Sequence, residues 1–223
     1  MSYKYHIDKI FIEIVIKSVN FDATVIHILM KTTFSLFSLI CLISVSSFIS
    51  AQTSNMELPI YDKEDLNLRN VDTIPDFESK INKLKISGVI YKSDGVTPAK
   101  DVILYVQQPD ENGDFELIEE NDKRYVNHRG WVKTDADGRY TFYTFVPGGD
   151  RRYNQLQQLY PIVKEPSKDA YEVETFLFDE DPLLTKTCRK RMAKKGDPTR
   201  ILKLITEEGM LVAQRDIVLK ADS

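Results

Sequence analysis

The feature that most constrains the fold is a four-residue turn between two apolar segments. Residues 135–138, Asp-Ala-Asp-Gly, separate residues 130–134 from residues 140–146. An Asp-Gly pair supplies the left-handed backbone conformation that a tight hairpin turn requires. Both the odd and the even positions of residues 140–146 are largely apolar or aromatic, the pattern of a strand covered on two faces. The sequence therefore predicts a hairpin whose second strand lies in the middle of a sheet.

Other short β-rich segments follow the same plan, each ended by turn residues such as Ser93-Asp94-Gly95. A last hairpin is expected to pair residues 200–205 with residues 210–219. Many short strands with regular turn signals predict an all-β fold, a sandwich or an open barrel. The remaining expected strands are residues 86–91, 102–106, 161–164 and 173–178.

One segment has a helical repeat instead. Leu184, Cys188 and Met192 recur every four residues, which predicts one short helix over residues 183–194 with a single apolar face. Cys188 is then expected to be a buried, small apolar side chain. The basic residues 189–191, 194 and 195 are expected on the solvated side of this helix, with an anion-binding patch as the alternative.

The segment 30–51 has the three parts of a secretory signal peptide. Lys31 precedes an apolar run over residues 34–49, and Ser50-Ala51 offers a small-residue cleavage site. The run is shorter than the roughly 20 residues that a bilayer-spanning helix needs. We therefore expect export to the periplasm or the extracellular space, with no stable membrane span after cleavage. Residues 1–29 would be an upstream extension; alternatively, Met1 is the true start and residues 34–49 are a signal anchor.

The rest of the chain divides into a leader or linker, residues 52–82, and one domain, residues 83–223. The formal net charge is −4, with acids and bases interspersed, so nothing favours a nucleic-acid partner. A single cysteine remains after residue 51, which excludes a disulfide within one mature chain. The sequence leaves the oligomeric state open.

A resemblance to a known family rests on two adjacent blocks. Residues 129–135 read Arg-Gly-Trp-Val-Lys-Thr-Asp, and residues 138–148 read Gly-Arg-Tyr-Thr-Phe-Tyr-Thr-Phe-Val-Pro-Gly. Together they resemble a sequence motif of the intradiol ring-cleavage dioxygenases. A weaker similarity to this family extends over residues 84–219. The resemblance implies a prealbumin-like β-sandwich. It also implies an enzyme that cleaves catechols with a ferric ion, held by two tyrosinates and two histidines and assisted by an arginine.

The residues at the implied positions are different in this chain. Phe115 and Asp150 stand where the family has its two tyrosines. Gln158 and Tyr160 stand at the two histidines, and Gln155 replaces the arginine. Of the three histidines, His6, His27 and His128, only the last follows the expected cleavage site. We therefore expect that the ordinary ferric site is lost and that no cofactor is bound.

A substitute site is the alternative. Asp150, Tyr153, Tyr160 and His128 could supply a carboxylate, phenolates and an imidazole to Fe(III). Simpler roles are expected for each: a loop ion pair of Asp150 with its neighbouring arginines, half-buried aromatic rings for the tyrosines, and a hydrogen-bonded polar side chain for His128. The acidic residues 179–181 are expected to form a solvated turn, with calcium as the alternative.

Three functions follow from these observations. The first is an exported protein without ring cleavage, with a binding or structural role and a small planar or aromatic ligand near Phe115, Tyr153 and Tyr160. The second is an active dioxygenase with a rearranged iron site. The third is a generic prealbumin-like module in a surface or polysaccharide-handling assembly. This third function is favoured if the structure does not bring Phe115, Asp150, Gln158 and Tyr160 together in one cleft.

Overall fold

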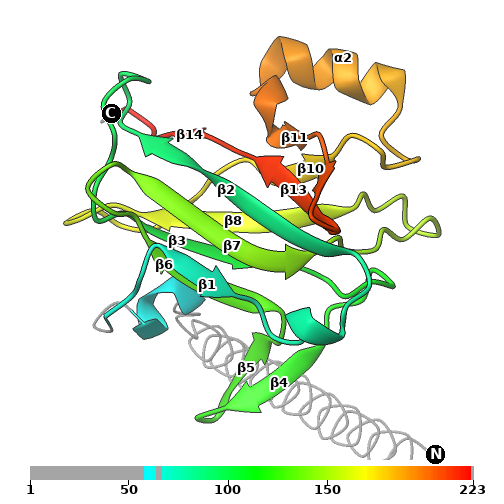
Figure 1. Cartoon of the computed structure of the whole chain (residues 1–223), viewed down its shortest axis with the longest axis horizontal. Coiled ribbons are helices and arrows are strands. Elements are labelled where there is room, and N and C mark those ends of the chain that lie inside the picture. Colours follow the sequence, from blue (N-terminus) through cyan, green and yellow to red (C-terminus); the bar gives the residue numbers. More distant parts are fainter. Residues whose placement is uncertain (1–57, 64–66, 222–223) are drawn as a thin grey trace, which may run out of the picture. The chain divides into compact units, whose positions relative to one another are not determined.

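The computed structural model describes residues 58–63 and 67–221, and the expected signal segment lies outside this range. The strands form two sheets and a separate hairpin (Figure 1). The first sheet has the order β1 (Val71–Thr73), β7 (Arg139–Phe145), β2 (Lys83–Tyr91), β13 (Met210–Gln214) and β12 (Ile205–Glu207), with β14 (Ile217–Val218) also paired to β2. The second has the order β11 (Ile201–Leu202), β10 (Phe176–Phe178), β8 (Gln158–Lys164), β3 (Ile103–Gln107) and β6 (Arg129–Lys133), with β9 (Tyr171–Glu172) paired to β8. The hairpin consists of β4 (Leu117–Glu120) and β5 (Lys123–Val126).

The main hydrophobic core lies between the two sheets. Leu84, Ile86 and Phe142 from the first sheet meet Leu104 and Val163 from the second, and all five are buried. Facing sheets with interdigitated apolar side chains are the defining arrangement of a β-sandwich. The expected fold class, an all-β sandwich with one short helix, is confirmed.

The turn at residues 135–138 is correctly predicted, but the hairpin is wrong. Gly138 adopts φ +70°, and its N–H bonds to the carbonyl of Asp135 at 3.0 Å. The two flanking strands then enter different sheets, because β6 pairs with β3 whereas β7 pairs with β2 and β1. A local turn signal does not specify which partners the strands find. The placement of β7 inside a sheet, between β1 and β2, is confirmed.

The reading of residues 52–82 as a linker is wrong where the structure describes them. β1 pairs with β7, and Ile74 is buried in the main core. The 3-10 helix η1 (Pro59–Lys63) covers the outer face of the second sheet, where Ile60 packs with Tyr105 and Trp131. Two single apolar residues in a polar segment give no periodic signal, so this contribution could not be seen in the sequence.

The C-terminal part agrees with expectation in its turn but differs in the pairing of the first arm. The turn at Glu208-Gly209 does join paired strands, β12 and β13. However, the segment expected as the first arm divides, since β11 pairs with β10 in the other sheet. The 3-10 helix η3 (Pro198–Arg200) leads into β11.

No helix among the described residues is long and apolar enough to cross a membrane.

The predicted helix is α2 (Lys186–Lys195), and it begins three residues later than expected because Thr185 caps its N-terminus. No side chain within α2 is buried; Cys188 and Met192 are half-buried, and buried Leu184 precedes the helix. The expectation of a fully buried Cys188 is therefore wrong. Arg189 also departs from the solvated side, because its guanidinium bonds to the side chain and carbonyl of Asp179.

Candidate functional site

Two glycine-containing loops meet at the beginning of β8, where the resemblance places the catalytic residues. Gly113 has φ +91°, and a Cβ there would lie 3.1 Å from the carbonyl carbon of Gly149. A Cβ on Gly148 would lie 2.4 Å from the carbonyl oxygen of Glu111. The absence of side chains thus lets the two loops touch through their backbones. This contact brings the loop before Phe115 against the backbone of Asp150.

Phe115 and Tyr160 form an aromatic pair at this place. Their ring centroids are 5.6 Å apart with an interplanar angle of 54°. The side-chain amide of Gln158 donates to the hydroxyl of Tyr160 at 2.5 Å. Burial raises the pKa of the Tyr160 phenol, and the bond from Gln158 opposes this only in part. The phenol is therefore held neutral, as a hydrogen-bond acceptor for an amide.

Asp150 is engaged in its own loop. Its carboxylate accepts two bonds from the Arg152 guanidinium, at 3.1 and 2.8 Å, which confirms the expected ion pair. Arg152 lowers the pKa of Asp150. The backbone of Asp150 pairs with that of Gln155. Tyr153 is 79% exposed, with the Arg152 guanidinium 5.7 Å from its ring centroid, so the expectation of a half-buried Tyr153 is wrong.

His128 belongs to a different group of side chains. Its Nε2 faces Asp76 and Glu116, and its ring meets Phe145 edge-on at 4.9 Å. The ring is 1% exposed and its Nδ1 has no hydrogen-bond partner. The expectation of a fully hydrogen-bonded histidine is therefore correct for only one of its two nitrogens.

Asp181 is a structural residue of the site that sequence reasoning missed. It is buried, and its carboxylate accepts from the N–H groups of Gln157 and Leu183, both at 2.8 Å. The expected solvated turn is wrong at this position, since Asp181 fixes the entry into β8. An Asp followed by Pro182 is a turn signal. The bond to Gln157 spans 24 residues, so no local sequence pattern predicts it.

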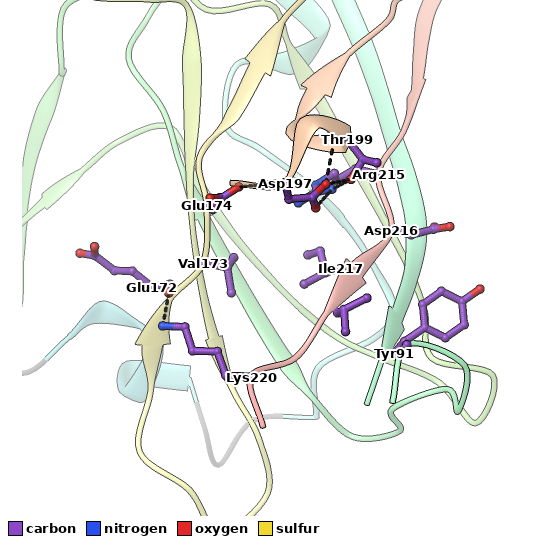
Figure 2. A pocket seen from close by; sticks show the side chains of 12 residues that line it. Tyr91, Glu172, Val173, Glu174, Asp197, Thr199, Arg215, Asp216, Ile217 and Lys220 are labelled. Carbon is purple, nitrogen blue, oxygen red and sulfur yellow. Dashed lines mark hydrogen bonds and ion pairs between the residues drawn. The ribbon is translucent and has the colours of Figure 1, made fainter. Parts of the chain in front are cut away.

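A cavity of about 740 Å³ lies elsewhere, between the ends of β2, β9 and β14 (Figure 2). Arg215 lies on one wall, where it binds Asp197 at 2.8 Å. Lys220 on the opposite wall donates to the carbonyl of Glu172 at 3.2 Å. None of the residues at the implied catalytic positions lines this cavity.

The residues at the implied iron positions do not fit a ferric ion. Ferric iron is stabilised by hard, anionic oxygen ligands, with imidazoles to complete the site. Phe115 has no ligand atom, and Gln158 offers a neutral amide that is already bonded to the Tyr160 hydroxyl. Burial raises the pKa of Tyr160, which disfavours its phenolate form. Asp150 is the one anionic donor of the four, and Arg152 neutralises it. No catalytic step through iron can be derived from this set.

No family model and no curated protein sequence matches the chain. Solved structures do match. The dioxygenase domain of a dioxygenase–carbohydrate-binding protein fusion from Streptomyces sp. SirexAA-E has a TM-score of 0.53 at 19% identity, covering 70% of this chain and 89% of that chain. The catechol 1,2-dioxygenase of Acinetobacter radioresistens has a TM-score of 0.51 at 14% identity, covering 69% and 58%. The enzyme from Pseudomonas arvilla C-1 gives 0.51 at 13% identity, covering 67% and 56%.

The fold is that of the intradiol ring-cleavage dioxygenases. The chain spans less than two thirds of the length of the Acinetobacter and Pseudomonas enzymes. At these identities the likeness to intradiol dioxygenases concerns the sandwich and carries no conclusion about chemistry. Tyr160 contacts both Phe115 and Gln158. The backbone of Asp150 lies beside Gly113, two residues before Phe115.

Proposed function

We propose that this chain is an exported relative of the intradiol dioxygenases that has lost ring cleavage and serves in binding. One observation carries the proposal: the implied iron positions are filled by side chains that bond to each other or to an arginine. The Tyr160 hydroxyl accepts from Gln158, and Asp150 accepts from Arg152. The glycines that bring the two loops together are retained, so the scaffold of the site persists without its chemical groups.

The aromatic pair supports a planar ligand. Phe115 is 39% exposed although its ring lies against Tyr160. An exposed aromatic ring on a half-buried partner presents an apolar face on which a flat ring can stack. Asp150, whose backbone lies beside Gly113, and its partner Arg152 offer polar groups that could orient such a ligand. We therefore propose a small aromatic or planar molecule as the ligand class.

The loss of ring cleavage is tested on full-length protein treated with Fe(III) and then dialysed. We expect less than one iron per chain, no visible phenolate-to-iron absorption band, and no oxygen uptake with catechol or protocatechuate. Stoichiometric iron together with oxygen uptake would establish the rearranged dioxygenase instead. In that case Tyr160→Phe should abolish the uptake.

A variant in which the family's iron ligands are restored also tests whether the loss of these ligands explains the loss of iron binding. Phe115→Tyr, Asp150→Tyr, Gln158→His and Tyr160→His together restore two phenols and two imidazoles. We expect this protein to bind iron with a visible band, whereas Phe115→Tyr with Asp150→Tyr alone should bind it more weakly. Failure of a folded quadruple variant to bind iron would contradict the placement of these four positions.

Ligand binding is tested with catechol as a non-reacting probe. In NMR spectra we expect catechol to perturb the ring signals of Phe115 and Tyr160, and Phe115→Ala to abolish the effect. Tyr91→Phe, at the separate cavity of Figure 2, is the matched control. Perturbations confined to the surroundings of Tyr91 would refute the proposed binding place.

A further inference from the structure

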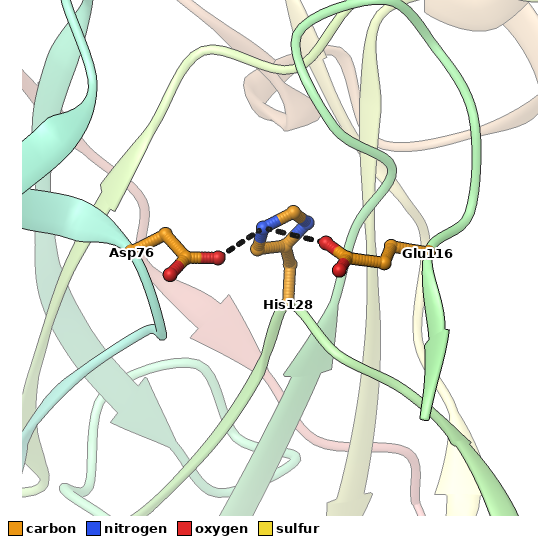
Figure 3. Close-up of side chains that lie close together, drawn as sticks. All are labelled: Asp76, Glu116 and His128. Atoms are coloured by element: carbon orange, nitrogen blue, oxygen red, sulfur yellow. Dashed lines mark hydrogen bonds and ion pairs between the residues drawn. The ribbon is translucent and has the colours of Figure 1, made fainter. Parts of the chain in front are cut away.

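Three potential metal ligands from separate parts of the chain converge where the β4–β5 hairpin joins the sandwich (Figure 3). Asp76 precedes the 3-10 helix η2 (Phe77–Ser79), Glu116 precedes β4, and His128 precedes β6. His128 Nε2 lies 3.2 Å from Asp76 Oδ2 and 3.8 Å from Glu116 Oε2. The ligand atoms all lie within 4.8 Å of one another.

The three side chains differ in burial in a way that suits an ion. His128 is 1% exposed, and Phe145 lies edge-on against its ring, so the imidazole is a fixed donor on the inner side. The side chains of Asp76 and Glu116 are 50% and 55% exposed. An ion between them could enter from solvent and keep water molecules as additional ligands.

Without an ion, this arrangement leaves charges poorly compensated. A neutral imidazole can donate through Nε2 to only one carboxylate at a time. The amide of Asn127 donates to both carboxylates, at 3.3 Å to Asp76 and 3.1 Å to Glu116. Asn127 thus aligns the two carboxylates, but it brings no positive charge.

We propose that Asp76, Glu116 and His128 bind one divalent transition-metal ion, with Zn²⁺ as the probe. One imidazole nitrogen and two carboxylate oxygens are ordinary Zn²⁺ ligands, and the imidazole disfavours Ca²⁺ and Mg²⁺, which prefer all-oxygen sites. Asn127 is a positioning residue that acts through both carboxylates. The site shares no residue with the Phe115–Tyr160 cluster, so it is independent of the proposed ligand binding.

The lack of a partner on Nδ1 sets the strength of the site. Metal-binding histidines usually donate their other N–H to an acceptor, and the loss of such a partner typically costs about 10–100-fold in affinity. His128 has no such acceptor. We therefore expect a Zn²⁺ affinity lower than that of structural zinc sites in which every histidine is so supported.

The test is a Zn²⁺ titration of the chelator-treated full chain by calorimetry. A His6→Gln/His27→Gln background removes the other two imidazoles of the chain. We expect one Zn²⁺ per chain, with Asp76→Asn and Glu116→Gln each weakening binding at least about 10-fold, since even outer-shell changes have effects of this size. Glu119→Gln, an exposed residue of the same hairpin, should bind as the parent does. Ca²⁺ at equal concentration should not compete.

Thermal unfolding separates loss of the site from loss of the fold. Zn²⁺ should raise the unfolding temperature of the parent and of Glu119→Gln, because a ligand that binds only the folded state stabilises it. It should raise that of Asp76→Asn and Glu116→Gln less than that of the parent at the same Zn²⁺ concentration, although both should stay folded in chelator. The proposal would be overturned if Asp76→Asn and Glu116→Gln bound Zn²⁺ as tightly as the parent. It would also be overturned if Zn²⁺ bound only through His6 and His27, or if one-to-one binding were not seen.

Discussion

Thr144 donates its hydroxyl to the side-chain carbonyl of Gln108, at 2.5 Å, in the interior between the two sheets. Thr144 belongs to β7 and Gln108 directly follows β3, so the bond links one sheet to the other. The amide of Gln108 also donates to the carbonyl of Phe145 at 3.1 Å. Both side chains are fully buried. This polar link is stable because each group has a partner.

We predict that Thr144→Val lowers the free energy of unfolding by about 1–3 kcal/mol, because it leaves the Gln108 carbonyl buried without its donor. Gln108→Leu should also destabilise, and the double variant should lose less than the sum of the two, since the groups act as a pair. Denaturant unfolding measures all three. Exposed Thr206→Val is the control and should stay within about 0.5 kcal/mol. Strict additivity of the two core changes would contradict the pairing.

Ile60 tests whether η1 belongs to the folded domain. Ile60 is fully buried and packs in the same cluster as Trp131, whose indole N–H donates to the carbonyl of Pro59 at 3.1 Å. Ile60→Ala should lower the free energy of unfolding by about 2–5 kcal/mol through the cavity that it creates. Trp131 is the only tryptophan, so its emission should shift to the red. Ile81→Ala, at a residue that is 90% exposed, should change neither quantity.

Asp94 gives a prediction in terms of pH. The hydroxyl of Thr97 and two backbone N–H groups hold the pKa of Asp94 at about 2, against an ordinary value of 3.8. A depressed folded-state pKa stabilises the protein above the unfolded value, and this contribution is lost as the pH falls through about 2. Thr97→Val should raise the pKa of Asp94 toward 3.8, as measured by NMR titration. The stability difference between Thr97→Val and the parent should be greatest above pH 3.8 and should shrink toward pH 2. An unchanged pKa would contradict a role for the Thr97 hydroxyl.

Much of the sandwich could be predicted from local sequence patterns. The alternation in β7 and the glycine at position 138 are local signals, and both correctly indicated a central strand and a tight turn. The pairing of strands was not local. β6 and β7 are adjacent in sequence but lie in different sheets, since β6 pairs with β3 whereas β7 pairs with β2 and β1.

The site was less predictable for a physical reason. The implied catalytic positions could be named because the resemblance to the intradiol dioxygenases assigns them, after Gly113 for Phe115 and after the Pro147-Gly148 turn for the others. The Asp76–Glu116–His128 group could not, since 52 residues separate Asp76 from its histidine. Single carboxylates carry no pattern that sets them apart from solvated ones, and only the folded chain brings these three side chains together.

Strand β2 has parallel partners that follow it at a long distance in sequence: Leu211 stands opposite Leu84, and Ile217 opposite Ile90. During synthesis, one side of β2 therefore stays unpaired until a long intervening segment has been made. An open strand edge is a template for aggregation, so this protein needs protection for longer than a fold built from neighbouring hairpins.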